Sequence, residues 1–311
     1  MDASADHPLL HTLLERCREL PPVPTAVVHP CDSLSLQGVV DAARQGLIIP
    51  ILVGPPAKIG AAAKAGGLDI SGFRLEPTLH SHAAAARAVA LVRSGEAAML
   101  MKGALHTEEL MHEVVAADSG LRTGRRISHA FLMDVKAYPR PLIITDAAIN
   151  VLPSLEDKRD IVQNAIDLAA MLQISSPRVA ILSAVETVTP KLPSTIDAAA
   201  LCKMADRGQI TGGLVDGPLA FDNAVSPEAA REKGIVSEVA GRADILVVPD
   251  LEAGNMLVKQ LSFLAGADAA GVVLGARVPV VLTSRADNAI ERVASCAVGV
   301  LLAHARPAVA A

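Results

Sequence analysis

The run Leu47-Ile48-Ile49-Pro50-Ile51-Leu52-Val53 is continuously apolar and rich in β-branched residues, a pattern typical of a strand buried on both faces. Ala26-Val27-Val28 shows the same pattern upstream, and Ala-rich amphipathic segments separate such runs. Continuous apolar strands that alternate with helices indicate a mainly parallel sheet covered on both faces. The sequence therefore predicts an α/β fold. Further runs of this kind are Ala98–Met101, Ile143–Thr145, Val179–Leu182, Leu214–Val215, Ile245–Val248, Val272–Leu274 and Val280–Leu282.

Several of the intervening helices carry start and stop signals. Ser154 is placed to cap a helix, with Asp157 three residues further on. Ser226-Pro227-Glu228 combines a cap residue, a proline at the first helical position and an acid in the first turn, and Lys233-Gly234 is the expected stop. Apolar residues at helical spacing predict another helix within His7–Leu20.

The chain has 311 residues, of which 51% are hydrophobic. This length allows two domains of roughly 150 residues each, and the apolar fraction rules out intrinsic disorder. Tyr138-Pro139-Arg140-Pro141 breaks the local pattern and is the expected crossing between the domains. Because no flexible linker is present, the two domains are expected to be rigidly apposed, with a ligand site in the cleft between them.

The chain is poor in aromatic residues, with one Tyr, four Phe and no Trp, and its formal net charge is −5. Single-stranded nucleic acids are held by stacking on aromatic rings and by basic surfaces. Both features are missing here, so nucleic-acid binding is excluded.

Targeting signals are also missing. A membrane-spanning helix needs about 20 apolar residues, and the charge-free stretch Val293–Ala303 is much shorter. The first residues lack the basic and apolar regions of a signal peptide. Cys17, Cys31, Cys202 and Cys296 are scattered, which is typical of small buried residues in a reducing compartment. We expect a soluble cytoplasmic protein.

Common catalytic motifs are lacking: the sequence has no phosphate-binding G-x-x-x-x-G-K-[ST] loop, no H-E-x-x-H and no G-x-S-x-G. His80-Ser81-His82 holds the one close histidine pair, and no carboxylate or thiol stands beside it in the sequence. A polar loop is the preferred interpretation, and His106 and His112 are expected at the surface or in packing. We therefore expect no metal site.

Polar clusters follow the predicted strands at their carboxyl ends, where α/β folds bind ligands. In Lys102–Thr107 a glycine permits close approach of a ligand, and a helix that begins near Thr107 offers N–H groups to an anion. In Thr283–Asp287 two hydroxyls and a guanidinium suit a phosphate. For the first cluster an ordinary Thr-capped helix is slightly preferred, and for the second a Ser or Thr cap with a surface arginine is an equally good interpretation.

Three more clusters follow strands in the middle of the chain. Ser183–Thr187 opens a long polar loop, of the kind that is often functional. Asp216–Asn223 is acidic and rich in turn residues, and it is either a structural turn or the wall of a cleft. In Pro249–Asn255, Asp250 is a helix-cap candidate and Asn255 a ligand candidate. The residues by themselves thus indicate a cleft suited to a small anion.

These clusters, in this order, resemble the phosphate acyltransferase family, which includes phosphate acetyltransferases and phosphate butyryltransferases. The resemblance covers most of the chain from about Ile49 onward. The butyryl-type branch is resembled most in Ile181–Thr187 (ILSAVET), Ile196–Gly208 (IDAAALCKMADRG), Val215–Asn223 (VDGPLAFDN), Ala243–Met256 (ADILVVPDLEAGNM) and Thr283–Asp287 (TSRAD), and more weakly in Met101–Thr107 and Leu121–Val135.

The resemblance implies a two-domain, three-layer α/β fold like that of isocitrate and isopropylmalate dehydrogenases, with the active site in the interdomain cleft. It implies a discontinuous first domain made of residues 1–139 and 271–311. Residues 140–270 would form the second domain, through which the family usually dimerises. The expected assembly is a homodimer.

The activity that the resemblance implies is reversible transfer of a short acyl group between coenzyme A and inorganic phosphate, with an acyl phosphate such as acetyl phosphate as product. Coenzyme A is then a co-substrate, and no cofactor is bound permanently. Ser284 matches the family's serine, which hydrogen-bonds the developing oxyanion or the thiol, and Arg285 matches its phosphate-binding arginine. Substrate contacts are expected from Lys102, Gly103, Ser183, Thr187, Asp216, Asn255 and Thr283.

The chain departs from the acetyl-type pattern in two places. Where those members carry an Asp seven residues after the serine as the base, this chain has Glu291, and Asp287 competes for the role. The arginine that those members carry after Gly103 is missing, so Arg122, Arg125 and Arg126 become candidates for the coenzyme A phosphates. For at least two of the three, a solvated basic loop is the preferred interpretation.

Two alternatives stay open at this point. One is a nicotinamide-dependent dehydrogenase on the same fold, which needs aspartates four residues apart for a metal, whereas Asp157 and Asp160 are three apart. The other is a non-catalytic protein that binds acyl-CoA or acyl phosphate. The choice between acetyl and butyryl substrates is also open.

Overall fold

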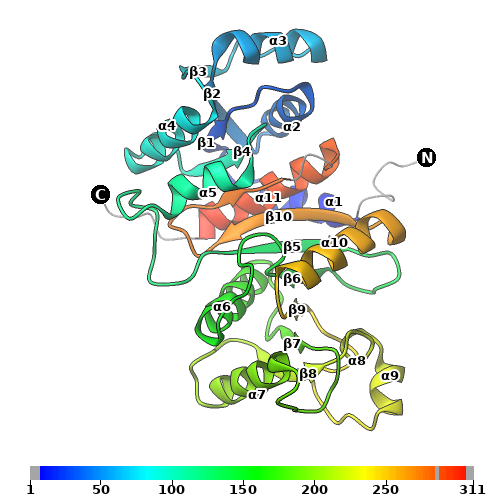
Figure 1. Cartoon of the computed structure of the whole chain (residues 1–311). Helices are drawn as coiled ribbons and strands as arrows, with labels where there is room; N and C mark the ends of the chain where they lie inside the picture. Colours follow the sequence, from blue (N-terminus) through cyan, green and yellow to red (C-terminus); the bar gives the residue numbers. More distant parts are fainter. Residues whose placement is uncertain (1–7, 284–286, 306–311) are drawn as a thin grey trace, which may run out of the picture. The chain divides into compact units, whose positions relative to one another are not determined.

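The computed structural model describes residues 8–283 and 287–305. The chain divides into two compact units (Figure 1). Unit 1 contains Met1–Arg125 and Ala270–Ala311, and unit 2 contains Arg126–Ala269. The first boundary therefore lies between Arg125 and Arg126, earlier than the expected position after residue 139, because the strand that follows Arg126 pairs within unit 2.

Unit 1 alternates strands and helices along the chain. Its strands lie in the order β3-β2-β1-β4-β11-β10, with parallel pairing except between β10 and β11. The strands are β1 (Val23–Val28), β2 (Ile48–Gly54), β3 (Arg74–Pro77), β4 (Met99–Lys102), β10 (Asp268–Leu274) and β11 (Val280–Val281). The helices are α1 (Pro8–Cys17), α2 (Ser33–Arg44), α3 (Pro56–Gly66), α4 (Ser81–Arg93), α5 (Thr107–Val115) and α11 (Ala289–Ala305).

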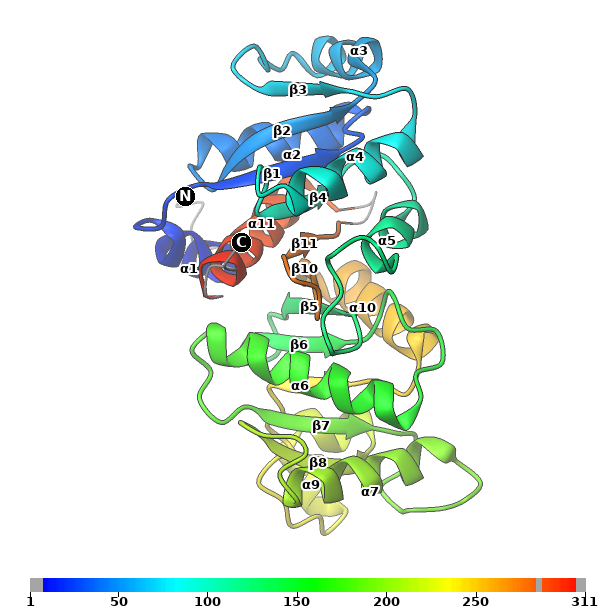
Figure 2. The same cartoon turned by 90° about the vertical axis from the view of Figure 1, so that its left-hand side faces the viewer.

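The apolar run at residues 47–53 forms β2 as predicted. It pairs with β1 in a parallel register that sets Val27 opposite Leu52, and both side chains are fully buried. Helices α2 and α4 cover opposite faces of these strands (Figure 2), which is why the strands are largely apolar.

Unit 2 has the strand order β5-β6-β9-β7-β8, in which β5 and β6 are antiparallel and the other pairs are parallel. Its strands are β5 (Ser128–Asp134), β6 (Leu142–Thr145), β7 (Arg178–Leu182), β8 (Leu214–Leu219) and β9 (Ile245–Val247). Its helices are α6 (Leu155–Met171), α7 (Pro193–Asp206), α8 (Phe221–Val225), α9 (Pro227–Glu232) and α10 (Leu251–Ala265). The core beside these strands includes Met133, Leu142, Ile144, Leu219 and Leu246.

The expected helix starts are confirmed. Ser154 and Asp157 form a capping box at α6, and the Ser226 hydroxyl accepts the Ala229 N–H at the start of α9. Asp250 caps α10 through the Ala253 N–H. His80 caps α4, with its Nδ1 3.2 Å from the Ala83 nitrogen, rather than lying in a loop.

Two strands and one crossing differ from the sequence predictions. The short edge strand β3 is largely exposed, and β5 starts with polar residues, so neither shows a long apolar run. The segment 138–141 is the turn between β5 and β6 inside unit 2 and does not cross between units. Tyr138 closes this turn by donating its hydroxyl to the Ala243 carbonyl at 2.6 Å.

Within the described residues, no helix combines the length and apolarity that crossing a membrane requires. All four cysteines are free thiols.

Candidate active site

A pocket of about 330 Å³ opens in unit 1 where β1 and β4 end. Parallel strands of an α/β sheet place their carboxyl ends at one edge, which is where such folds bind ligands. The described residues that line the pocket come from β4, from the turn that follows it, and from the starts of α2 and α11. They are Asp32, Leu34, Ser35, Lys102, Gly103, Ala104 and Arg292.

Gly103 is needed here because two backbones approach closely. Its N–H donates to the Val28 carbonyl at 2.9 Å, and the next N–H, of Ala104, donates to the His29 carbonyl at 2.8 Å. A Cβ atom at position 103 would lie 2.5 Å from the Val28 carbonyl oxygen. The glycine therefore joins the ends of β1 and β4, and in doing so it shapes the pocket.

Lys102 and Thr283 are far apart in the sequence and meet beside this pocket. Lys102 is 4% exposed, and its Nζ lies 3.4 Å from the Thr283 carbonyl oxygen and 3.4 Å from that of Gly103. Thr283 is 2% exposed. The structure thus brings together Lys102, Gly103 and Thr283, three of the residues expected to contact substrate.

Arg292 is a pocket residue that sequence reasoning missed. It is 3% exposed, its Nη1 donates to the Thr283 Oγ1 at 2.9 Å, and its Nε donates to the Asp287 carbonyl at 3.2 Å. In the sequence it resembles an ordinary surface arginine of an amphipathic helix. The sequence does hold one signal for Arg292: most of the residues that follow it in α11 are small or apolar, so an arginine there is unusual.

Ser284 and Arg285 lie outside the described residues. The two candidate bases are described. Asp287 is partly exposed, and Glu291 is buried in the first turn of α11. The Glu291 carboxylate accepts the Asn288 N–H at 2.8 Å, and the Asn288 side chain accepts the Glu291 N–H at 2.9 Å. This reciprocal cap holds the Glu291 carboxylate at the helix start.

The remaining expected contacts lie in unit 2. The Ser183 hydroxyl is 2.8 Å from that of Ser194, and Asp216 accepts the Gly217 N–H at 2.8 Å. Asn255 donates weakly to a backbone carbonyl at 3.4 Å, and Thr187 is exposed. In the part of the chain that the structure describes, no hydrogen bond joins one of Ser183, Thr187, Asp216 and Asn255 to another.

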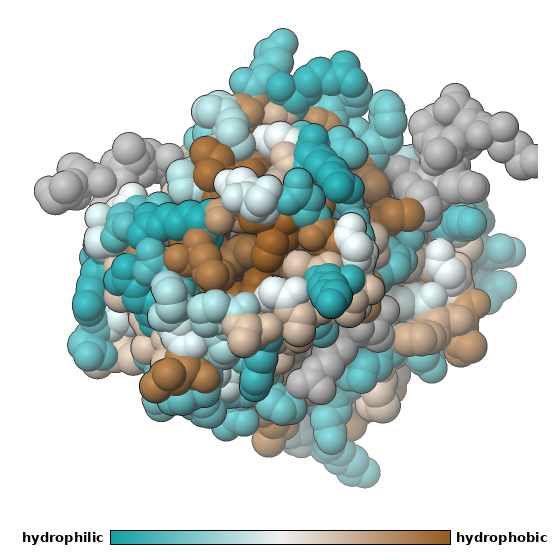
Figure 3. Space-filling view, turned by 90° about the horizontal axis from the view of Figure 1, so that it is seen from above, coloured by the Kyte–Doolittle hydropathy of each residue, from teal (hydrophilic) through white to brown (hydrophobic). Residues whose placement is uncertain are grey.

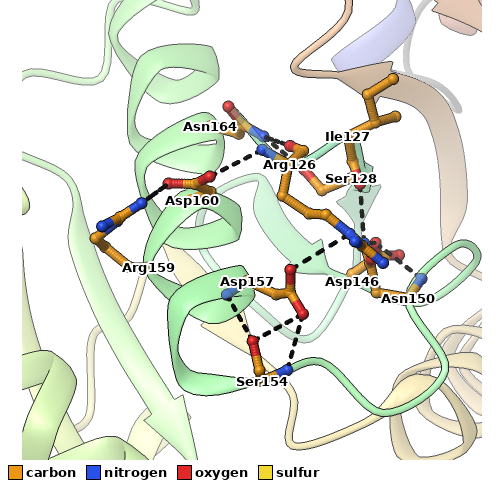
Figure 4. Close-up of polar contacts among 10 residues, drawn as sticks. All are labelled: Arg126, Ile127, Ser128, Asp146, Asn150, Ser154, Asp157, Arg159, Asp160 and Asn164. Carbon is orange, nitrogen blue, oxygen red and sulfur yellow. Dashed lines mark hydrogen bonds and ion pairs between the residues drawn. The ribbon is translucent and has the colours of Figure 1, made fainter. Parts of the chain in front are cut away.

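Arg126, one of the three candidate arginines for coenzyme A phosphates, is held by neighbouring side chains. Figure 4 shows its guanidinium between Asn150 and Asp157: Nε donates to Asn150 Oδ1 at 2.7 Å and lies 3.5 Å from Asp157 Oδ1. Asn150 is held in turn by the buried Asp146, whose carboxylate also accepts backbone N–H groups of the same turn. The Arg126 side chain stays 53% exposed, so its charge is oriented and still reaches solvent.

Asp157 and Asp160 already have partners within unit 2. Asp157 accepts the Ser154 N–H at 3.0 Å, and Asp160 accepts the Arg126 N–H at 2.8 Å and pairs with Arg159 at 2.9 Å (Figure 4). Both carboxylates therefore serve the local structure of α6. Among the described residues, no group of three or more His, Cys, Asp or Glu side chains is arranged to hold a metal ion.

The four cysteine thiols are held mainly in the protonated form by their surroundings. Burial raises the pKa of Cys31, beside the pocket residue Asp32, to about 11, and it raises the pKa of Cys202 to about 12. Cys17 and Cys296 are buried and shifted upward in the same way, to about 11 and about 12. A protonated thiol is a poor nucleophile, so these four cysteines are weak candidates for a nucleophilic role.

Comparison with known proteins identifies the family. The profile of the family described as "Phosphate acetyl/butaryl transferase" matches residues 79–300. The phosphate acetyltransferase of Rhizobium meliloti is 64% identical over 296 residues, which are 95% of this chain and 94% of that protein. The phosphate butyryltransferase of Clostridium acetobutylicum is 42% identical over 288 residues, 93% of this chain and 95% of that protein.

Solved structures agree with these sequence matches. A branched-chain phosphotransacylase from Enterococcus faecalis V583 superposes with a TM-score of 0.78 at 30% identity, over 90% of this chain and 99% of that one. The 4-hydroxythreonine-4-phosphate dehydrogenase of Klebsiella pneumoniae superposes with a TM-score of 0.54 at 14% identity, over 91% of this chain and 99% of that one, which relates the fold to that of a dehydrogenase. The chain belongs to the phosphate acetyl/butyryltransferase family.

Proposed function

We propose that this protein catalyses reversible transfer of a short acyl group between coenzyme A and inorganic phosphate. The observation that carries the proposal is the 64% identity to a phosphate acetyltransferase along 95% of the chain. The pocket with two buried cationic side chains, Lys102 and Arg292, supports it, because every substrate of this reaction carries phosphate.

The chemistry is an acyl transfer through a tetrahedral intermediate. A phosphate oxygen forms a bond to the carbonyl carbon of the acyl-CoA, the carbon–sulfur bond then breaks, and the departing thiolate takes up a proton. In the reverse direction a carboxylate removes the proton from the thiol, which is mostly protonated at neutral pH. Coenzyme A acts as a co-substrate, and no permanently bound cofactor takes part in this scheme.

We assign the roles within this scheme to residues around α11. Ser284 donates to the developing oxyanion, a contribution of about 3 kcal/mol for such a donor, and Arg285 binds the phosphate. Glu291 is the preferred base because its cap holds the carboxylate in place at the helix start, and Asp287 is the competing candidate. Thr283 adjoins this group and contacts Lys102.

The proposal assigns substrate contacts to both units. Lys102 and Gly103 belong to unit 1, whereas Ser183, Thr187, Asp216 and Asn255 belong to unit 2. Arg126 is assigned to a phosphate of coenzyme A, since its guanidinium is oriented and exposed. A cytoplasmic location, where coenzyme A and reduced thiols occur, fits the four free cysteines.

The two alternative functions lack such support. The similar proteins with high identity are named as acyltransferases, and Asp157 and Asp160, the carboxylates considered for a dehydrogenase metal, have structural partners. Both acetyl- and butyryl-type relatives match nearly the whole chain, so the acyl preference needs kinetic measurement.

The test is thiol release from acetyl-CoA and butyryl-CoA, measured with and without inorganic phosphate. We expect phosphate-dependent release, with kcat/KM for the two substrates deciding the acyl preference. Ser284→Ala and Arg285→Ala should each lower turnover by at least about tenfold while the circular dichroism spectrum stays unchanged. Absence of phosphate-dependent release with either acyl-CoA would refute the proposed function.

The same assay separates the two candidate bases. If Glu291 is the base, Glu291→Gln lowers kcat much more than Asp287→Asn does, and the opposite order assigns the role to Asp287. Because Glu291 also caps α11, the thermal unfolding midpoint of each variant is measured alongside its kinetics.

A further inference from the structure

Two buried cationic side chains from distant parts of the sequence converge on one residue beside the pocket. Lys102, at the end of β4, approaches the carbonyl oxygen of Thr283, and Arg292, in the first turns of α11, donates to its hydroxyl. Both cations also line the pocket. Two buried cationic side chains that line one pocket make that pocket attractive to an anion.

Helix α2 has a glycine, Gly38, at the point where the Arg292 side chain packs against it, although glycine lowers helix propensity. The aliphatic part of its side chain crosses α2 at Gly38, where a Cβ atom would lie 2.8 Å from Cδ and 2.9 Å from Cβ of Arg292. Glycine is the least favoured residue in a helix interior after proline. The close packing of the Arg292 side chain therefore explains why a glycine stands in the middle of α2.

Hydrogen bonds to two described residues help to orient the guanidinium. Nε donates to the Asp287 carbonyl at 3.2 Å and Nη1 to the Thr283 hydroxyl at 2.9 Å. A guanidinium with a fixed plane presents its N–H groups as a fork, which matches the oxygens of a phosphate. Fixing the fork in advance reduces the entropy lost when an anion binds.

The start of α2 completes the pocket wall. Leu34 and Ser35 line the pocket, and the Asp32 carboxylate, also in the lining, accepts the Ser35 N–H at 2.7 Å. The amino end of a helix carries partial positive charge, which favours an anion nearby. The carboxylate of Asp32 works against this effect, so the cations must provide the main attraction.

We propose that Arg292, together with Lys102, forms an oxyanion-binding subsite in this pocket, which holds a phosphate group of the substrates. The inference rests on the proposed function and adds Arg292 to the residues that bind its substrates. The phosphate group is either inorganic phosphate, which becomes the phosphoryl group of the acyl phosphate, or a phosphate of coenzyme A.

The kinetic test uses Arg292→Gln, which removes the charge, and Arg292→Lys, which keeps the charge and loses the fork. Initial rates are measured with inorganic phosphate and acyl-CoA varied in turn, and in the reverse direction with coenzyme A and dephospho-coenzyme A. The matched control is Arg44→Gln, which removes an arginine at the end of α2 whose side chain is 65% exposed.

We expect Arg292→Gln to raise one phosphate-linked KM by about tenfold or more, the effect of losing a charge-assisted hydrogen bond, and Arg292→Lys to restore part of it. A rise in the KM for inorganic phosphate assigns the subsite to that substrate. A rise in the KM for coenzyme A that disappears with dephospho-coenzyme A assigns it to the 3′-phosphate. A fall in kcat with every KM unchanged would overturn the proposal, since Arg292 would then only hold the chain around Thr283.

A second variant, in α2, tests whether the position of the Arg292 side chain matters for binding. Gly38→Ala forces the Arg292 side chain to shift without removing any charge. We expect it to raise the same KM as Arg292→Gln, by a smaller factor, and this variant remains informative if Arg292→Gln fails to fold. An unchanged KM in Gly38→Ala, with the Arg292 variants also unchanged, would contradict the subsite.

A binding measurement separates failure of this inference from failure of the proposed function. A ligand that binds only the native state raises the unfolding midpoint with concentration, so thermal unfolding is followed against inorganic phosphate, with chloride at matched ionic strength as the reference. We expect a phosphate-specific shift in the wild-type protein and in Arg44→Gln that is lost in Arg292→Gln. If neither phosphate nor coenzyme A shifts the wild-type midpoint more than chloride does, the subsite is refuted even in an active enzyme.

Discussion

At the scale of single residues, the thiol of Cys31 illustrates how burial decides chemistry. Cys31 directly precedes Asp32, which lines the pocket, and a thiol at such a place is a possible acyl acceptor. Burial, however, raises its pKa to about 11, so the charged form that would attack a carbonyl is scarce. The side chain thus behaves as a small apolar residue near the site.

This leads to a prediction for pH dependence. Because the pKa is raised, the thiolate fraction at pH 8 is about one in a thousand, and it should increase about tenfold per pH unit up to pH 10. Iodoacetamide should therefore modify the native protein about a hundredfold more slowly at pH 8 than it modifies a free cysteine. Cys31→Ser identifies the contribution of this thiol and should keep full transferase activity. Rapid inactivation at pH 8 that Cys31→Ser abolishes would contradict both statements.

At the scale of elements, the start of α6 links a helix cap to the candidate coenzyme A contact. Ser154 and Asp157 satisfy each other's backbone N–H groups, and Asp157 also lies 3.5 Å from the Arg126 guanidinium. The capping box therefore fixes the carboxylate that helps to orient Arg126. Local helix chemistry and the geometry of the site are coupled at this point.

Ser154→Ala should lower the free energy of unfolding by about 1 kcal/mol, the usual cost of losing a serine cap. Ser154→Asp keeps an acceptor at the cap and should stay within a few tenths of a kcal/mol of the wild-type protein. Urea unfolding followed by circular dichroism measures both variants. Equal destabilisation by Ala and Asp would show that the cap hydrogen bond is not what stabilises this end of α6.

At the scale of the whole molecule, α10 stands out because so few of its side chains are buried. Met256, Phe263 and Leu264 are 60%, 73% and 84% exposed, and their spacing of seven and eight residues places them on one helix face. Figure 3 shows one face of the molecule from above, on which apolar side chains gather near the centre and polar side chains lie around them. Large apolar side chains exposed together on one helix are typical of a protein interface.

We propose that the protein is a homodimer that uses this face of α10. Leu264→Glu combined with Phe263→Glu should then convert the dimer to a monomer, because charges would be buried at the interface. Light scattering after size-exclusion chromatography measures the mass. Leu79→Glu replaces a leucine of unit 1 that is 88% exposed and serves as the control, with no change expected. A monomeric wild-type protein, or a dimer that survives both glutamates, would exclude this interface.

The elements and their local chemistry could be predicted from the sequence because their causes are local. The apolar run at 47–53 became β2, and Ser154 and Asp250 became helix caps, since strand burial patterns and caps depend on residues a few positions apart. Strand β3 escaped prediction because an edge strand needs no apolar run. The motifs likewise carried enough information to indicate the family.

What only the tertiary structure decided is the meeting of residues that are distant in the sequence. Lys102 and Thr283 are separated by 181 positions, and no periodicity within α11 or α2 shows that Arg292 lies across Gly38. The boundary between Arg125 and Arg126 depends in the same way on the pairing of β5 with β6. Local propensity determines each strand and helix. Long-range packing determines which of their side chains share a pocket, and those side chains form the site.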